Sequence, residues 1–197
     1  MPRVSNWPSR AVLEETILSF IAEHGLTQWS LRTLATHLGV STYTLTYHFG
    51  SKEQLIGVIL TNFENRMQSM MAEWAQEQKM TTSALIQRYW EWLLLPENTS
   101  FGQTFFEIYG QALRNPAQFA PFLASGFPSW MELLQQRLEL EGLHTPSPAI
   151  LSSILVSSVT GLYLDWLTLH DTRRTTETIE YLCQWVNDLL SQKTPGM

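Results

Sequence analysis

The sequence predicts an all-α protein. Apolar residues recur at helical spacing along the 197 residues, and neither alternating apolar runs nor Asn-Gly hairpin signals suggest strands. The hydrophobic share of 44% and the charged share of 15% are those of an ordinary globular chain, which argues against disorder. A chain of this length is large enough for a sizeable core and for two domains.

A first helix is predicted close to the N-terminus. His24 followed by Gly25 supplies a cation and a left-handed residue, a pair that is typical of a helix C-terminus. We therefore expect this helix to end near residue 24. The residues that share its apolar face are Leu13, Ile17, Phe20 and Ile21.

Two short helices follow, with a tight turn between them. The first runs from 31 to 38 after Ser30 as its N-cap, and the second begins at Ser41. Two helices cross closely only where a small residue lies at the crossing, the turn tolerates a positive φ and apolar residues flank both helices. Ala35 and Gly39 meet the first two demands. The third is met by Leu34, Leu38, Val40 and Leu45.

This spacing leaves two interpretations open. An ordinary helical corner has it, and so does a helix-turn-helix, whose second helix meets base edges with its N-terminal residues. In the second interpretation Ser41 caps the recognition helix. The residues expected to face outward from it are Thr42, Tyr43, Thr44, Thr46 and Tyr47.

A long helix is predicted to open at residue 51. Ser51 and Gln54 form a capping box, and an apolar stripe from Leu55 to Trp74 keeps helical spacing, long enough to run from one domain into the other. Pro116 and Pro148 are each expected at a first helical position, while Gly126 and Pro128 are expected to kink a helix. The later helices are predicted at 83–95, 101–114, 116–140, 148–170 and 175–191.

Charge and cysteine content narrow the class of protein. The net charge is −6, but residues 1–60 carry four basic and four acidic side chains, so the acidic excess lies in the remainder. A neutral N-terminal head on an acidic body favours DNA binding by the head. Cys183 is the single cysteine, which excludes an intrachain disulfide and fits a reducing cytoplasm. We see no signal peptide and no uninterrupted apolar run of membrane length, so no membrane partner is expected.

The residues give little support to an enzyme. A helical enzyme with a tryptophan-rich pocket would need a nucleophile, a base or a metal set, and the sequence has no His-Glu helix motif, phosphate loop or Gly-x-Ser-x-Gly elbow. We therefore expect no catalytic residues, no metal site and no cofactor.

Residues 10–60 decide between the corner and the helix-turn-helix, because this quarter of the chain resembles the DNA-binding domain of the TetR family throughout. The matching positions include Phe20, Gly25, Ala35, Gly39-Val40-Ser41, Leu45, His48, Phe49 and Ser51-Lys52-Glu53. The resemblance implies an N-terminal three-helix helix-turn-helix domain over 1–50 and a helical ligand-binding and dimerisation domain over 51–197. It also implies phosphate contacts for Thr42, His48 and Lys52. Two positions depart from the family pattern, since Thr46 stands where a tyrosine is usual and Tyr43 where a small residue is common.

The resemblance also implies a homodimer whose last two helices pair across a two-fold axis. In the segment 148–170, small residues four apart form a groove in which another helix can approach, and the segment 175–191 has a broad apolar face. Packing within the subunit is the alternative use of the groove, but a two-fold protein suits a palindromic site. The residues expected at this interface are Ser153, Ser157, Gly161, Leu182 and Val186.

Aromatic residues crowd into the body, where the resemblance implies a small-molecule pocket. Scattered carboxylates favour a cationic lipophilic ligand, while Arg88 or Arg114 would favour an anion. The residues expected to bind the ligand are Tyr89, Trp90, Phe105, Tyr109, Trp130 and Trp166. The resulting hypothesis is a repressor that binds a palindromic operator in double-stranded DNA and is released by a small lipophilic effector. The alternative is an activator or a ligand-independent regulator of the same family.

Overall fold

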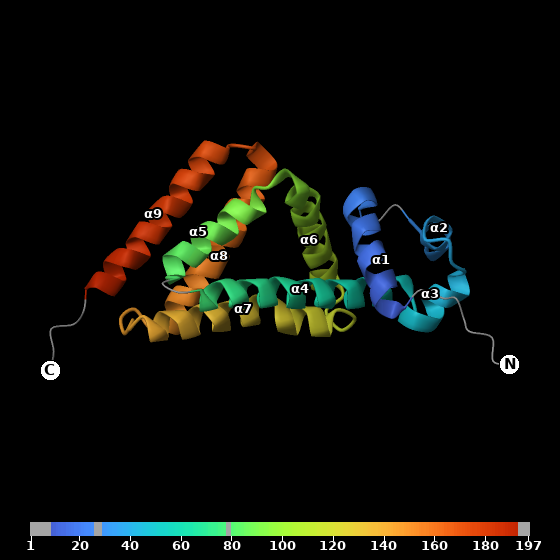
Figure 1. Cartoon of the computed structure of the whole chain (residues 1–197), viewed down its shortest axis with the longest axis horizontal. Helices are drawn as coiled ribbons and strands as arrows, with labels where there is room; N and C mark the ends of the chain where they lie inside the picture. The colour runs from blue at the N-terminus through green and yellow to red at the C-terminus, as the bar shows by residue number, and fades with distance from the viewer. Residues whose placement is uncertain (1–8, 26–28, 78–79, 193–197) are drawn as a thin grey trace. The chain divides into compact units, whose positions relative to one another are not determined.

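The computed structural model describes residues 9–25, 29–77 and 80–192. Helices account for 83% of these described residues, and no strand occurs among them, so the all-α prediction is confirmed. The helices, which are labelled in Figure 1, belong to two compact units: unit 1 spans 1–63 and 103–123, and unit 2 spans 64–102 and 124–197. Unit 1 thus takes in more of the chain than the head predicted at 1–50.

Unit 1 begins with three short helices, each with a serine cap. They are α1 (Arg10–His24), α2 (Leu31–His37) and α3 (Thr42–Phe49). The side chains of Ser9, Ser30 and Ser41 accept hydrogen bonds from backbone N–H groups in the first turns of these helices. Gly25 follows α1 with a φ of 70°, as its predicted end requires.

A single apolar core holds unit 1 together. The side chains of Leu13, Ile17 and Ile21 from α1 are 2% exposed or less, and they pack with residues from the other helices of the unit. The additional core residues are Phe20, Trp29, Leu34, Ala35, Leu45, Phe49, Leu55, Ile56, Ile59, Leu60, Ile108, Ala112, Phe119 and Phe122. At roughly 1.5 to 3 kcal/mol for each large buried side chain, this core fixes how α2 and α3 cross.

The capping box predicted at the start of the long helix is confirmed. In α4 (Lys52–Gln76), the Ser51 hydroxyl accepts from the Gln54 N–H at 3.2 Å, and the Gln54 side-chain oxygen accepts from the Ser51 N–H at 2.9 Å. The helix runs through 25 residues and includes the boundary between the units at residues 63 and 64. The next boundary lies within α6 (Pro96–Arg114).

The remaining helices follow the predicted order with shifted ends. They are α5 (Thr82–Leu93), α7 (Ala120–Leu140), α8 (Pro148–Leu169) and α9 (Thr172–Ser191). Pro96 opens α6 instead of ending the previous helix. The expectation that Pro116 stands at a first helical position is wrong, because residues 116–119 form a separate turn in which the Asn115 carbonyl accepts from Gln118 and Phe119, and α7 begins only at Ala120. The expected kink in α7 is present at Gly126, whose ψ of −106° is not helical.

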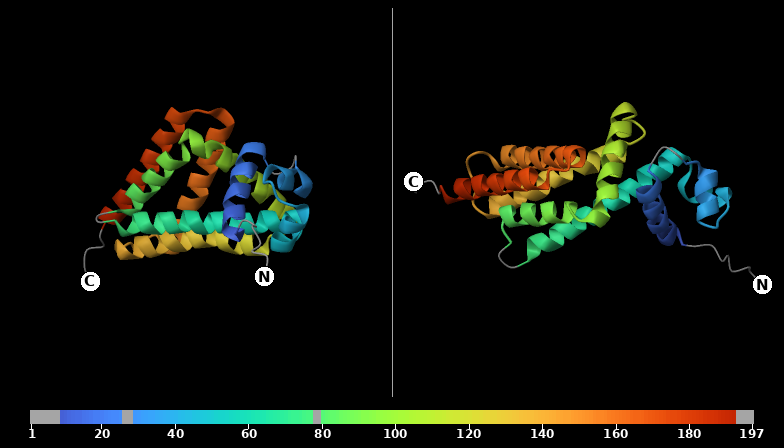
Figure 2. Two further views of the ribbon diagram at one scale, coloured as in Figure 1. Left: turned by 45° about the vertical axis from the view of Figure 1, so that its right-hand side comes forward. Right: turned by 90° about the horizontal axis from the view of Figure 1, so that it is seen from above.

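In unit 2, α9 lies along both α5 and α8, and Figure 2 shows α8 and α9 side by side. Polar contacts support the apolar packing. The Ser83 hydroxyl donates to the Cys183 carbonyl at 3.2 Å and lies 2.7 Å from the Asn187 side-chain oxygen. At the start of α5, the Glu141 carboxylate accepts from the Thr82 N–H at 2.6 Å and from its hydroxyl at 2.8 Å. A carboxylate at a helix N-terminus is stabilising because orphan N–H groups point towards it.

Candidate functional site

The helix-turn-helix lies in α2 and α3. Gly39 has a φ of 65°, and the Val40 N–H donates to the Ala35 carbonyl at 3.0 Å, so the chain reverses direction within a few residues. Ala35 and Leu45 are both buried, at 3% and 0% exposure. Ala35 and Leu45 therefore have the structural roles predicted for them. The face of α3 that lies away from Leu45 is held outward.

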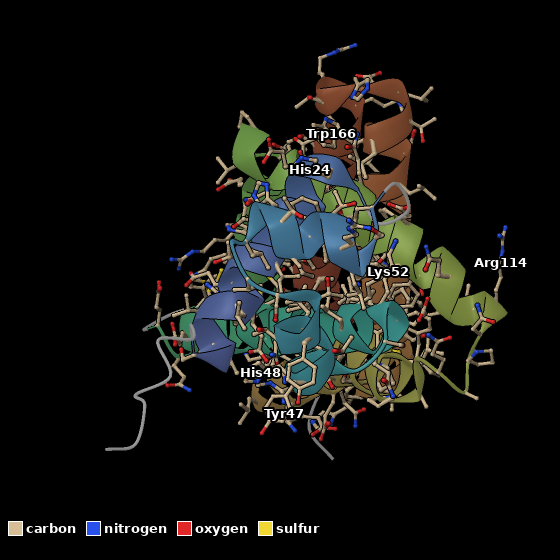
Figure 3. The ribbon with its side chains drawn as sticks, turned by 90° about the vertical axis from the view of Figure 1, so that its right-hand side faces the viewer. His24, Tyr47, His48, Lys52, Arg114 and Trp166 are labelled. Carbon is tan, nitrogen blue, oxygen red and sulfur yellow. The ribbon has the colours of Figure 1, made fainter. Side chains whose placement is uncertain are left out.

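Two tyrosines dominate the outward face of α3. The side chains of Tyr43 and Tyr47 are 68% and 70% exposed, and their rings stack one helical turn apart with centroids 6.2 Å from each other. His48 lies edge-on to Tyr47 at 5.3 Å and is half-buried (Figure 3). Exposed tyrosines present both a flat apolar ring and a hydroxyl, which suits contacts to base edges and to phosphates.

The expectation that Thr44 faces outward is wrong. Its side chain is 3% exposed, and its hydroxyl lies 2.8 Å from the Ser41 hydroxyl, which also accepts from the Thr44 N–H at 3.0 Å. Ser41 and Thr44 thus hold the start of α3 together. Thr42 and Thr46 are exposed, but the Thr46 hydroxyl donates within its own helix, to the carbonyls of Thr42 and Tyr43. Such internal bonds occupy the hydroxyl proton.

Lys52 lies at the start of α4, half-buried, and contacts Trp29 in the segment before α2. Its ammonium donates to the Trp29 carbonyl at 2.6 Å and lies 4.2 Å from the centre of the Trp29 ring. Burial lowers the pKa of Lys52, while the nearby carboxylates of Glu53 and Glu107 act in the opposite direction. An ammonium has three donors, so the bond to Trp29 leaves capacity for a phosphate oxygen.

We expect Lys52→Met to make the negative slope of log affinity against log salt shallower by about 0.9, because one phosphate contact and its released counterion are lost. Methionine keeps an apolar stem over Trp29, so the packing of the head is largely retained. Affinity for a DNA duplex at several salt concentrations measures the slope. An unchanged slope would assign Lys52 to packing alone.

Four of the aromatic residues predicted to bind a ligand lie in unit 2. The Tyr89 ring lies 5.4 Å from that of Trp130 and stacks on that of Trp92 at 6.1 Å. Trp90 and Trp166 flank Tyr163, with ring centroids at 6.3 and 5.7 Å from it. Their indole N–H groups donate to Thr176 at 3.1 Å and Thr172 at 2.9 Å, which ties α5 and α8 to α9. Trp90 and Trp166 are thereby satisfied within the subunit.

The other two predicted ligand residues lie in unit 1. The rings of Phe105 and Tyr109 are 4.8 Å apart on α6, and Tyr109 packs on Phe122 at 4.9 Å. The six residues therefore divide into separate clusters in the two units. Spacing along the sequence did not reveal this division, because α6 itself contains a boundary between the units.

The residues predicted at the dimer interface divide into an exposed and an enclosed set. Ser153, Ser157 and Gly161 are exposed on α8, and Leu182 is half-buried on α9. Val186 has no exposed surface and packs inside the subunit. Between α8 and α9 lies a groove of about 500 Å³, lined by Ser157, Ser158, Gly161, Leu162, Asp165, Thr178, Tyr181, Leu182 and Trp185.

The outer surface of α8 is apolar as well as small. Ile150, Ile154 and Leu164 are 58%, 39% and 49% exposed. By length and composition, this helix would be able to cross a membrane, and 39% of its apolar window is buried. Because the same helix packs along α9, an exposed apolar face on it also suits a protein partner.

Sequence reasoning missed Glu64 of α4. Its side chain is 3% exposed, and burial raises its pKa to about 7, although a hydrogen bond from Ser125 acts against the rise. Its position on the apolar side of α4 was a signal in the helical periodicity. In the described part of the chain, no group of three or more His, Cys, Asp or Glu side chains is placed to hold a metal ion.

Comparison with known proteins gives matches of two kinds. A family model described as bacterial regulatory proteins of the tetR family matches residues 15–59, which include α2 and α3. No curated protein sequence matches the chain significantly. Solved structures with the same fold cover nearly the whole chain.

Three solved structures illustrate the similarity. A transcriptional regulator from Rhodococcus sp. Rha1 has a TM-score of 0.76 at 19% identity, over 93% of this chain and 97% of that one. A TetR transcriptional regulator from Legionella pneumophila has a TM-score of 0.69 at 19% identity, over 93% and 98%. FadR from Bacillus subtilis, in complex with stearoyl-CoA, has a TM-score of 0.68 at 13% identity, over 88% and 95%. At these identities the likeness establishes the fold.

Proposed function

We propose that this chain, whose residues 15–59 match the model of the tetR family of bacterial regulatory proteins, represses transcription from a palindromic operator until a small lipophilic effector releases it. It is a DNA-binding regulator and not an enzyme. Within the proposal it acts in the cytoplasm as a homodimer.

The outward face of α3 is the observation that carries the proposal. Tyr43 and Tyr47 are large side chains that bury little of their own surface in the head, so packing does not account for them. Ser41 and Thr44 fix the start of the helix from which they project. A recognition helix requires this combination of a rigid start and exposed side chains in its first turns.

The proposed dimer uses α8 and α9. A palindromic site requires two recognition helices related by a two-fold axis, and the groove beside Gly161 offers a close approach to a second copy. The exposed apolar residues of α8 continue the same surface and would be covered in the dimer. A specific and stable protein interface usually buries about 800 Å² or more on each partner.

Release by an effector requires a path from unit 2 to the head. Helix α4 supplies it covalently, since it begins at Lys52 beside Trp29 and ends at Gln76 in unit 2. An effector bound in unit 2 lowers operator affinity only if it binds better to the arrangement that does not fit DNA. FadR, whose structure contains stearoyl-CoA, shares the fold, which supports a ligand-binding role for unit 2.

Selection of duplexes from a random pool tests the proposal directly. We expect the wild-type protein to select a two-fold symmetric sequence, and Tyr43→Ala to select a broader set, because it removes an exposed side chain from the first turn of α3. Substitution of a lysine that contacts only phosphate would instead lower the affinity for all DNA sequences alike. Enrichment of no symmetric sequence would contradict the proposed operator. An activator is the alternative, and transcription from the selected site with and without the protein separates the two.

A further inference from the structure

Glu64 is a buried carboxyl group whose hydrogen-bonding capacity is half used. Its side chain is 3% exposed, and Oε2 accepts a hydrogen bond from the Ser125 hydroxyl at 2.9 Å. Oε1 is buried and has no hydrogen-bond partner among the described residues. Carboxylates are rarely enclosed in this way unless they are paired, because removal of the charge from water is costly. A buried acceptor of this kind is suited to a donor that arrives from outside.

Ser125, which lies on α7, makes a second hydrogen bond to α4. The Gln68 amide, one turn further along α4, donates to the Ser125 carbonyl at 3.2 Å. Ser125 is therefore fixed to α4 through both its backbone and its side chain, just before the kink at Gly126. Its hydroxyl constrains the orientation of the Glu64 carboxyl group, which positions Oε1.

Glu64 lies close enough to Tyr89, an aromatic residue of unit 2, to affect its pKa. Burial is the main cause that raises the pKa of Tyr89, and the electrostatic effects of Tyr163 and Glu64 add to it, so these groups share one environment. Burial also raises the pKa of Tyr163 to about 12. Tyr89 in turn contacts Trp92 and Trp130. Aromatic faces beside a carboxyl group attract cations and repel anions.

Neither Arg88 of α5 nor Arg66 of α4 pairs with Glu64 in the part of the chain that the structure describes. Arg88 of α5 donates to Glu77 at 2.7 Å and lies 4.4 Å from the centre of the Trp74 ring. Arg66, two residues along α4 from Glu64, is exposed. In the described part of unit 2, neither of these cations pairs with Glu64. This removes the argument for an anionic ligand that Arg88 supplied from the sequence.

We propose that Glu64 anchors the effector and that the effector is a lipophilic amine, bound as a cation whose N–H group donates to Oε1. The inference rests on the proposed function, in which a small molecule controls operator binding, and it names the chemical class of that molecule. The aromatic side chains supply an apolar wall for the body of the ligand. Because Glu64 has a pKa of about 7, binding of a cation near neutral pH displaces the proton that half of the carboxyl groups carry.

Three small probes of the same shape test the charge preference. We would titrate the full-length protein by calorimetry with 1-naphthylmethylamine, 1-naphthylmethanol and 1-naphthoic acid, which are cationic, neutral and anionic at pH 7. We expect the amine to bind about tenfold more tightly than the alcohol or better, which is the effect of one charge-assisted hydrogen bond. The acid should bind most weakly. In buffers of different ionisation enthalpy, binding of the amine should release about half a proton.

Glu64→Gln should abolish both the preference for the amine and the proton release. Glu73→Gln removes a carboxylate from an exposed position on the same helix and should change neither. Equal binding of amine and alcohol by the wild-type protein, no binding of the amine, or a preference that survives Glu64→Gln would each overturn the proposal. Circular dichroism checks that both variants are folded.

Operator binding separates this inference from the proposed function. If the amine binds through Glu64 and weakens operator affinity, the ammonium site and effector release are both supported. If it binds through Glu64 and leaves operator affinity unchanged, the ammonium site stands and effector release fails for this ligand. If the amine weakens operator affinity equally in Glu64→Gln, effector release stands and Glu64 is not the anchor.

Discussion

Gly161→Glu is expected to yield a folded monomer that binds its operator about a hundredfold more weakly or worse, since the avidity of two linked half-site contacts is lost. Within the described part of the chain, a Cβ atom at Gly161 meets no heavy atom within 4 Å, so the subunit itself can hold a larger side chain there. A second copy in the groove cannot, because two glutamates would bring bulk and like charge to the two-fold axis. Sedimentation equilibrium measures the mass, and mobility shift measures the affinity.

Gly110→Glu is the matched control for this variant. Gly110 is an exposed helical glycine in α6 at which, among the described residues, a Cβ atom also meets nothing within 4 Å. The substitution makes the same change in charge and in helix propensity, but on a different helix. We expect it to remain dimeric. A dimeric Gly161→Glu would move the interface away from α8.

Glu64→Gln is expected to change how stability depends on pH. In the wild-type protein the pKa of Glu64 is about 7 in the folded state and close to 4.5 in the unfolded chain. The folded state therefore binds more protons between these values, and stability falls as pH rises from about 4.5 to 7. The total loss is roughly 2 to 3 kcal/mol, reduced somewhat for partial solvation of the carboxyl group.

Urea denaturation between pH 4.5 and 8 measures this contribution. Glutamine does not titrate, so the free energy of unfolding of Glu64→Gln relative to the wild-type protein should rise across this range by about the same 2 to 3 kcal/mol. The exposed Glu73→Gln should follow the wild-type curve. Parallel curves for Glu64→Gln and the wild-type protein would show that Glu64 does not change its pKa on folding.

The head shows which features local sequence determines. Ser30 and Ser41 cap helices, Ser51 and Gln54 form a capping box, and Gly25 and Gly39 adopt a positive φ, as their residue types indicated. These features depend on groups within a few positions of one another, so the sequence contains nearly all the information required. The apolar faces of α1 to α3 were likewise evident from periodicity.

Tertiary structure decided what those local features leave open. Periodicity did not show that Thr44 is buried, or that the Lys52 ammonium binds the Trp29 carbonyl, because each depends on packing between different segments of the chain. Glu64 meets Ser125 across 61 positions. Local sequence was enough to predict the order of the helices and the caps of α2, α3 and α4. Only long-range packing decides which polar groups are buried, because burial is a property of the folded chain and not of any local pattern. The Glu64 carboxyl group, which we propose as the ligand anchor, is therefore identified by the tertiary structure alone.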